Sequence, residues 1–170
     1  PDGDQWTPAE CDVAIRPGWF YHPEEDGKVK SPEQLADLYY RSVGHNATLL
    51  LNFPVDRDGL IHPVDSANAV NFHKLISREL SNNLVAGMKP KVSNERGKQF
   101  SANALTDNSW DTYWATSDGV TTADITFTFK RPQTMNRIML QEYIPLGQRV
   151  KKFAVEYLLP NGKWTAVEQG

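Results

Sequence analysis

The sequence predicts a chain of two parts, an α/β part over residues 1–87 and an all-β part over residues 88–170. In the first part, helical and strand-like hydrophobic patterns alternate, as they do in β/α units. In the second part, apolar residues recur with period two, which is typical of antiparallel strands. The charge changes at the same place. The first part holds 7 basic and 13 acidic side chains, a balance of −6, and the second holds 11 and 8, a balance of +3.

The first predicted elements are a strand over residues 9–15 and, after a loop, a helix. Ser31 is a favourable N-cap, Pro32 suits the first helical position, and Gln34 can close a capping box. Apolar residues then recur at helical spacing as far as Gly44, which is predicted to end the helix.

A second strand and a second helix follow. Residues 46–53 contain a continuous apolar core, which predicts a strand of a parallel sheet buried on both faces. Residues 56–59 (DRDG) predict a turn, and Asp65 is predicted to cap the second helix. The apolar face of this helix would hold Ala69, Phe72, Ile76 and Leu80.

The second part is predicted to be an antiparallel β-sandwich that contains no long helix. Its lead-in would be residues 84–103, which are rich in glycine, proline and polar side chains. Asn161-Gly162 is a strong signal for a hairpin between the last two predicted strands. The strands are predicted at residues 124–129, 137–141, 152–159 and 163–167.

Composition excludes several classes of protein. A net charge of −3 provides no basic field for nucleic acid and no polybasic membrane patch. Cys11 is the single cysteine, which excludes an internal disulfide framework and a cysteine-based zinc site. No apolar run approaches the roughly 18 residues that span a bilayer, and no signal peptide is recognised. We therefore expect a globular chain with no membrane span and no nucleic-acid partner.

The first part is too short for a closed barrel. Eight β/α units need about 250 residues, and residues 1–87 hold two units. Two units can neither close a barrel nor cover both faces of a parallel sheet. We therefore expect this chain to be a part of a longer protein, or to dock on one.

Residues 6–22 (WTPAECDVAIRPGWFYH) resemble the later part of the catalytic barrel of α-L-fucosidases of glycoside hydrolase family 29. Within that family they are most similar to the subgroup that favours branched α-1,3/1,4-linked fucose. Further segments resemble the same family in the same order: residues 42–46 (SVGHN), 49–52 (LLLN) and 56–59 (DRDG).

The second part resembles a discoidin-like domain of the coagulation factor V/VIII type C kind, also known as carbohydrate-binding module family 32. The family pairs its barrel with such a sandwich. The resemblance implies the last β/α units of a (β/α)8 barrel in residues 1–87, followed in residues 88–170 by a truncated discoidin-like jelly roll. The matching segments are residues 104–108 (ALTDN), 112–115 (TYWA), 140–144 (LQEYI) and 147–150 (GQRV).

The resemblance also implies a function. Family members resemble retaining glycosidases, in which an aspartate nucleophile and a glutamate acid/base remove terminal α-linked fucose. Both motifs lie on earlier barrel strands, and neither is present in this sequence. We therefore expect the parent enzyme, and not this chain alone, to be an α-L-fucosidase. Its partners would be a fucosylated glycan and the remainder of the parent chain, it would need no catalytic cofactor, and its location would be periplasmic or extracellular, as for bacterial members.

Trp19 is the first candidate for sugar binding. It lies in a loop just after a predicted strand, where barrel sites are built, and an indole face suits the apolar side of fucose. The resemblance places a sugar-packing aromatic in this region, whereas the alternative is a core tryptophan. Tyr21 lies in the same loop and is a weaker candidate. Arg16 could bind a substrate oxygen or pair with a carboxylate such as Glu10.

Glu10 is the one catalytic candidate within the chain. Glu10 and Asp12 alternate along a predicted strand, so their carboxylates would share a face, and one could raise the pKa of the other. The alternative is a structural carboxylate, and the family pattern places the acid/base elsewhere.

The second part offers a metal site and a polar set. Asp107 and Thr112 are candidate calcium ligands, since discoidin-like modules often carry a structural calcium at this loop. Trp110 is expected to be exposed and Trp114 to face the core. The polar set could bind sugar hydroxyls or fix the sandwich against the barrel, and it comprises Glu142, Gln148 and Arg149.

Three other polar features are predicted to be structural. His45 is interpreted as a turn histidine, and His62 is expected to be solvated. Asn46-Ala47-Thr48 is formally an N-glycosylation acceptor, but it is discounted because a buried strand would not be modified. The alternative to a fucosidase is a noncatalytic carbohydrate-binding protein based on the second part.

Overall fold

The computed structural model describes residues 7–167, which form two compact units that divide between Asn82 and Asn83. The predicted change from α/β to all-β character lies close to this division. No helix among the described residues has the length and apolar character that crossing a membrane requires.

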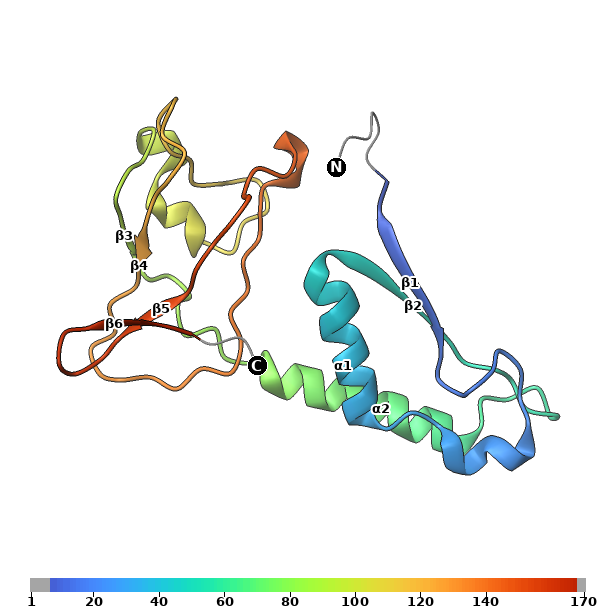
Figure 1. Cartoon of the computed structure of the whole chain (residues 1–170). Coiled ribbons are helices and arrows are strands. Elements are labelled where there is room, and N and C mark those ends of the chain that lie inside the picture. Colours follow the sequence, from blue (N-terminus) through green and yellow to red (C-terminus); the bar gives the residue numbers. More distant parts are fainter. Residues whose placement is uncertain (1–6, 168–170) are drawn as a thin grey trace. The chain divides into compact units, whose positions relative to one another are not determined.

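The first unit alternates strands and helices in the predicted order. The strands β1 (Ala9–Ala14) and β2 (Ala47–Asn52) pair in parallel, from Ala9 opposite Ala47 to Ala14 opposite Asn52. The helix α1 (Pro32–Ser42) connects them, and α2 (Pro63–Glu79) follows β2. Figure 1 shows the two strands side by side, with α1 running back along the unit and crossing α2. The predicted parallel β/α arrangement is confirmed.

The start of α1 follows the predicted chemistry. The Ser31 hydroxyl accepts the Gln34 backbone N–H at 3.3 Å, and the Gln34 side chain accepts the Ser31 N–H at 2.9 Å. These two bonds form a reciprocal capping box, which satisfies two of the N–H groups that a helix start leaves open. The Ser31 hydroxyl also holds the pKa of Glu33 below its usual value, by a hydrogen bond. The sequence therefore specifies this helix start locally.

The end of α1 differs from the prediction. The helix ends at Ser42, and a single 3-10 turn (Val43–His45) follows. The residue with left-handed backbone is Asn46, at φ 64°, and not Gly44. Asparagine tolerates this conformation better than most residues with a Cβ, so it can reverse the chain before β2.

The start of α2 also corrects a prediction. The N-cap is His62, whose Nδ1 accepts the Val64 N–H at 3.4 Å, and Pro63 is the first helical residue. Asp65 does not cap the helix. Its side chain is fully buried in the first turn, where Arg16 donates hydrogen bonds to both carboxylate oxygens.

The core of the first unit lies between the strands and the helices. Ile15 and Leu35 are almost fully buried, and Ala14 and Ala36 are buried beside them. Tyr39 of α1 meets Phe72 of α2 edge to face, with ring centroids 6.1 Å apart. Aromatic pairs prefer this geometry, which adds to the energy of area burial. Packing of the two helices therefore rests on the apolar faces that the spacing predicted.

Strand β2 is not buried on both faces in this chain. Leu50 is 51% exposed, and the burial of the strand alternates between half-buried and exposed positions. Among the described residues, β2 has β1 as its one strand neighbour. The continuous apolar run predicted two covered faces, whereas a two-stranded sheet beside two helices leaves part of β2 accessible.

The second unit has short ladders. The strand β3 (Lys91–Val92) pairs antiparallel with β4 (Ile125–Thr126), and β5 (Glu156–Leu158) pairs antiparallel with β6 (Trp164–Ala166). The predicted hairpin is confirmed: Gly162 has φ 80° and its N–H donates to Leu159 O at 2.9 Å. Residues 137–141 form no ladder in the described part of the chain, so the strand predicted there is wrong.

Stacked aromatic rings compensate for the short ladders of the second unit. Tyr113 stacks on Tyr143 at 4.5 Å between ring centroids, and the Tyr113 and Phe100 ring centroids are 5.0 Å apart. Trp114 is half-buried, and its indole N–H donates to Asn94 O at 3.1 Å. These contacts join segments far apart in sequence, which is the role that ladders play in larger sheets.

Candidate functional site

The candidate site lies at the carboxyl ends of β1 and β2. Parallel strands end at the same edge of a sheet, so the loops that follow them lie close together. Trp19, in the loop after β1, is 49% exposed. Asn52, the last residue of β2, donates from its side-chain amide to Trp19 O at 3.0 Å. The predicted tryptophan loop is therefore anchored to the next strand through its backbone.

A buried ion-pair network holds the start of this loop. Arg16 lies two residues after the end of β1, and its side chain has no exposed surface. Its Nε and Nη2 donate to the two oxygens of Asp65, at 2.8 Å each. Its Nη1 lies 2.9 Å from Asp26 Oδ1 and 3.4 Å from His22 O. A two-pronged arginine–carboxylate pair is strong and directional, so it fixes the start of the loop against α2.

The rings of Tyr21 and His62 pack beside this network. The Tyr21 ring lies over the Arg16 guanidinium, 4.7 Å from its centroid, and the Tyr21 hydroxyl donates to Asp26 Oδ2 at 3.5 Å. The His62 ring is 5.8 Å from the Tyr21 ring, and its Nε2 is 3.5 Å from Asp26 Oδ2. His62, which was predicted to be solvated, is therefore half-buried against Tyr21 and Asp26.

The charges in the network stabilise one another. The Asp65 carboxylate, followed by Asp26, raises the pKa of Arg16 above its ordinary value despite the opposing effect of burial. Burial raises the pKa of Tyr21, and the nearby Asp26 carboxylate raises it further. Arg16 thus stays cationic and Tyr21 stays a neutral hydrogen-bond donor at neutral pH.

Arg16 does not pair with Glu10. Glu10 lies on the exposed part of β1, opposite Thr48, while the guanidinium is held by Asp26 and Asp65. Contact between Arg16 and a ligand would require this network to open. The structure therefore gives Arg16 a structural position, and Tyr21 lies over it as a half-buried cover.

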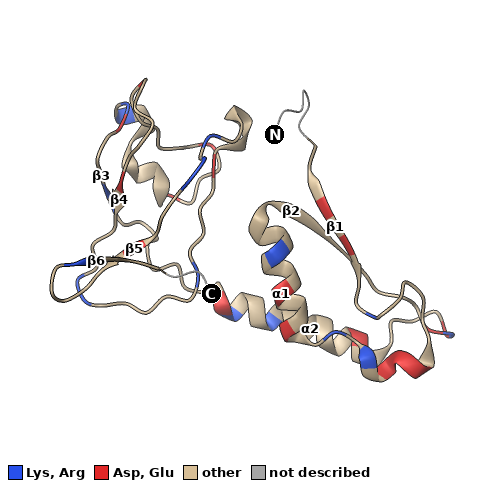
Figure 2. Ribbon diagram, viewed as in Figure 1, with Lys and Arg blue, Asp and Glu red and all other residues tan. Residues whose placement is uncertain are grey.

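The other acidic residues do not converge on a metal site. Glu10 and Asp12 are both exposed on β1, where Figure 2 shows acidic residues along the strand. Across residues 7–167, no group of three or more histidine, cysteine or acidic side chains is placed to hold a metal ion. Glu10 keeps its candidate role without a carboxylate partner from another element.

The predicted calcium ligands are bonded to each other. The Thr112 hydroxyl donates to Asp107 Oδ2 at 2.7 Å, and the Ser109 N–H donates to Asp107 Oδ1 at 2.9 Å. The Thr112 bond, and then the Ser109 bond, hold the pKa of Asp107 below its usual value. An ionised carboxylate and a hydroxyl suit a hard cation, and each oxygen keeps a free lone pair. The pair fits part of a calcium shell, with carbonyls and water needed to complete it.

The predicted polar set in the second unit divides into different roles. Glu142 Oε1 accepts the backbone N–H groups of Arg149 and Val150, both at 2.7 Å, which closes the intervening loop. The Arg149 side chain turns back to Leu146 O at 3.1 Å, and Gln148 is exposed. Glu142 is thus used within its own loop.

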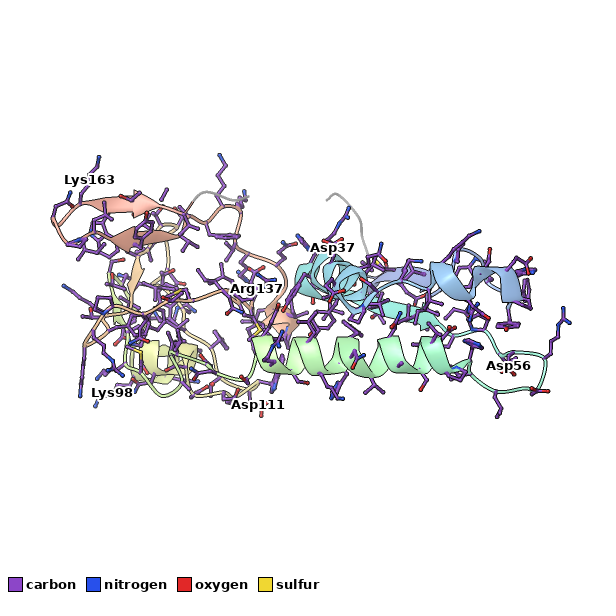
Figure 3. All side chains as sticks on the ribbon, turned by 90° about the horizontal axis from the view of Figure 1, so that it is seen from below. Asp37, Asp56, Lys98, Asp111, Arg137 and Lys163 are labelled. Atoms are coloured by element: carbon purple, nitrogen blue, oxygen red, sulfur yellow. The ribbon has the colours of Figure 1, made fainter. Side chains whose placement is uncertain are left out.

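Trp110 is the aromatic candidate for ligand contact in the second unit. It is 75% exposed, in the loop that also carries Asp111, which is labelled in Figure 3. Among the predicted ligand contacts of the second unit, this indole is the exposed aromatic one.

Three residues of the first site were not predicted: Asn52, Asp26 and Asp65 as an ion-pair partner. Asn52 carried one signal, since a polar side chain that ends an apolar strand often serves the edge of the sheet. Asp65 was noticed, but as a helix cap. Nothing local marked Asp26, because its partner Arg16 is ten positions away across a loop.

The comparisons with known proteins cover the same segments. Residues 90–170 match the family described as the F5/8 type C domain. Across the whole chain, the sequence is 36% identical over 172 residues to α-L-fucosidase 1 of Arabidopsis thaliana, and 99% of the chain is covered. Along its whole length the chain is thus similar to part of an α-L-fucosidase. It spans about a third of the length of the curated relatives that it matches, 34% in the Arabidopsis case.

Solved structures support the same relationship. A GH29 fucosidase of Ruminococcus gnavus in complex with fucose is 34% identical, with a TM-score of 0.82 over 99% of this chain and 34% of its own. A Bacteroides thetaiotaomicron protein assigned to the α-L-fucosidases is 46% identical, with a TM-score of 0.88 over 98% of this chain and 36% of its own. These matches agree with the predicted similarity to α-L-fucosidases and with an F5/8 type C domain over residues 90–170, whereas the described residues form no complete barrel.

Replacing Asp65 by asparagine should destabilise the chain strongly. The change removes the charge that neutralises the buried Arg16, and breaking a buried pair in this way costs about 3 to 5 kcal/mol. Urea unfolding of the 170-residue chain measures the loss. The matched control is Asp37→Asn, which breaks the exposed pair with Arg41 (3.3 Å) and should cost at most about 0.5 kcal/mol. Equal costs for the two variants would contradict the central role of the network.

Proposed function

We propose that this chain is part of a retaining exo-α-L-fucosidase and contributes one wall of the fucose site through Trp19. The whole enzyme would remove terminal α-linked fucose from glycans. The finer preference would be for branched α-1,3/1,4-linked fucose, and the enzyme would be exported from the cell. The observation that carries the proposal is the anchored, half-exposed Trp19 at the strand edge, in a chain related to a fucosidase whose structure holds fucose.

The geometry of the loop supports a binding role for Trp19. A core tryptophan would bury most of its indole, whereas this one keeps 49% of its surface accessible. Its carbonyl is fixed by Asn52, and the preceding Arg16 is fixed by Asp65. A rigid backbone that presents an exposed aromatic ring is the arrangement that positions a sugar without an entropic penalty at binding.

The chemistry of the reaction would come from outside this chain. A retaining glycosidase needs two carboxyl groups about 5 to 5.5 Å apart, one of them an acid with a raised pKa. Glu10 and Asp12 are exposed neighbours on one strand, and no other acidic side chain joins them among residues 7–167. We therefore assign the nucleophile and the acid/base to other parts of the enzyme.

A second candidate function is glycan binding by the second unit, favoured by the exposed Trp110. Discoidin-like folds hold ligands at loops, and the 75% exposed indole lies in a loop. In this alternative the unit would bind sugar without any catalytic role. The polar loop closed by Glu142 would then be a structural support and not a ligand contact.

A Trp19→Ala variant of the full-length enzyme should lose about tenfold in kcat/KM on an aryl α-L-fucoside. The loss of an aromatic face against the sugar is worth about 1 kcal/mol or more, and 1.36 kcal/mol corresponds to a factor of ten. Trp110→Ala is the matched control, since that residue belongs to the other unit, and it should leave kcat/KM unchanged. Unaltered kinetics in Trp19→Ala would remove Trp19 from the site.

The purified 170-residue chain should not cleave an aryl α-L-fucoside, because the proposed catalytic pair lies elsewhere. The measurement is release of the aryl alcohol, compared with the Glu10→Gln variant. Activity above background that Glu10→Gln abolishes would place the acid/base at Glu10. The same chain applied to a glycan array separates the second candidate: binding that survives Trp19→Ala but not Trp110→Ala would favour a noncatalytic module.

We also propose a structural calcium at the loop of Asp107 and Thr112. Calorimetric titration of the chain with calcium should show one binding event, which Asp107→Asn removes by taking away the ionised oxygen. Asp111→Asn is the control from the same loop, since no side-chain bond links Asp111 to Thr112 in the structure. Absence of binding by the unaltered chain would leave the Asp107–Thr112 bond as a purely local loop contact.

A further inference from the structure

The turn before β2 carries an acceptor sequence for N-linked glycan. Asn46-Ala47-Thr48 is the one Asn-X-Ser/Thr triplet in the 170 residues whose middle residue is not proline. The sequence pattern predicted a buried strand here, which would exclude modification. The structure does not support that objection, because Asn46 precedes the strand and is exposed, and Thr48 is exposed as well.

Asn46 is an exposed residue in a turn with left-handed backbone. The residue has φ 64° and ψ 31°, and its backbone N–H donates to Val43 O at 3.1 Å, so the turn is fixed by the main chain. The Asn46 side-chain amide makes no hydrogen bond with another residue in the described part of the chain. The neighbours Val43, Gly44 and His45 are all exposed. A glycan at Asn46 would therefore displace no packed side chain.

We propose that Asn46 is a site of N-linked glycosylation when this protein passes through a secretory pathway that contains an oligosaccharyltransferase. The donor class is a lipid-linked oligosaccharide. The Asn46 amide nitrogen attacks the anomeric carbon of the sugar, a C–N bond replaces the C–O bond to phosphate, the polyprenyl diphosphate leaves, and the amide gives up one proton. The Thr48 hydroxyl supplies the recognition element of the acceptor.

The position of Asn46 keeps the glycan away from the candidate sugar site. Asn46 lies before the first residue of β2, and Asn52, which anchors Trp19, is the last residue of that strand. At about 3.3 Å per residue the two ends are roughly 20 Å apart. Figure 1 shows the α1–β2 turn and the connection from β2 to α2 at opposite ends of the strand. The glycan would therefore shield the amino end of the sheet and leave the loop of Trp19 open.

The two roles of Asn46, as a turn residue and as an acceptor, can be separated by substitution. Asn46→Gly removes the amide but keeps the left-handed backbone accessible, since glycine adopts positive φ at no steric cost. Thr48→Ala keeps Asn46 and removes the hydroxyl, whereas Thr48→Ser restores a hydroxyl. Thr48 is exposed opposite Glu10, so neither change disturbs packing.

The test is expression of the full-length protein as a secreted product of eukaryotic cells, with analysis of both the medium and the cell lysate. We expect the wild-type protein and Thr48→Ser to carry a glycan that peptide-N-glycosidase removes, converting residue 46 to aspartate in the peptide mass spectrum. Asn46→Gly and Thr48→Ala should lack it. The lysate keeps the test informative if a variant fails to fold, because the glycan is added to the nascent chain.

Two outcomes would overturn the proposal. One is an unmodified Asn46 in wild-type protein from both fractions. The other is a glycosylated wild-type protein that stays in the cells while Thr48→Ala is secreted, because the fold would then not tolerate a glycan at this turn. Equal hydrolysis of an aryl α-L-fucoside by glycosylated and enzymatically deglycosylated protein would support the assigned distance from the site. That comparison is independent of whether Trp19 is the sugar contact.

Discussion

The first unit depends on the charge of Arg16 being neutralised away from water. An arginine side chain with no exposed surface is costly unless carboxylates and carbonyls take its donors, and here Asp65, Asp26 and His22 O do so. These partners come from α2 and from the 3-10 turn at Pro23–Lys28, while Arg16 follows β1. One guanidinium thus fixes three segments at the edge where the candidate site lies. The exposed Trp19 can be held in place because its loop begins at this buried charge.

The local parts of the fold and the parallel arrangement of β1 and β2 were predictable from sequence, whereas the burial of β2 and the side-chain contacts between distant residues were not. The capping box at Ser31 and the hairpin turn at Gly162 each depend on residues within a few positions, so pattern and propensity identify them. The burial of β2 was mispredicted because an apolar run indicates that its side chains favour burial, but does not indicate which elements of the chain cover them. Residues 137–141 failed as a strand for a related reason: their short apolar run indicates a preference for burial, but a ladder also needs a partner strand.

The candidate site shows the same division. Trp19 could be proposed from its place after a strand, because that placement is a local feature. Its supports could not, since Asn52 and Asp65 reach the loop from 33 and 49 positions away in sequence. Asp65 was expected to cap α2, and His62, which was expected to be solvated, caps it instead. The pairing of Asp65 with Arg16, which only the folded chain reveals, uses the carboxylate that would have served as the cap.

The hydrogen bond from Asn52 reaches the backbone carbonyl of Trp19, and not its indole. Every amino acid offers the same carbonyl, so the anchor of the loop is indifferent to the side chain that the position carries. The side chain at position 19 can therefore vary between relatives without loss of the hydrogen bond that holds the loop. Under the proposed role of Trp19, sugar preference could change by single substitutions at this position, whereas a change at Asn52 or Asp65 would disrupt the contacts that hold the loop.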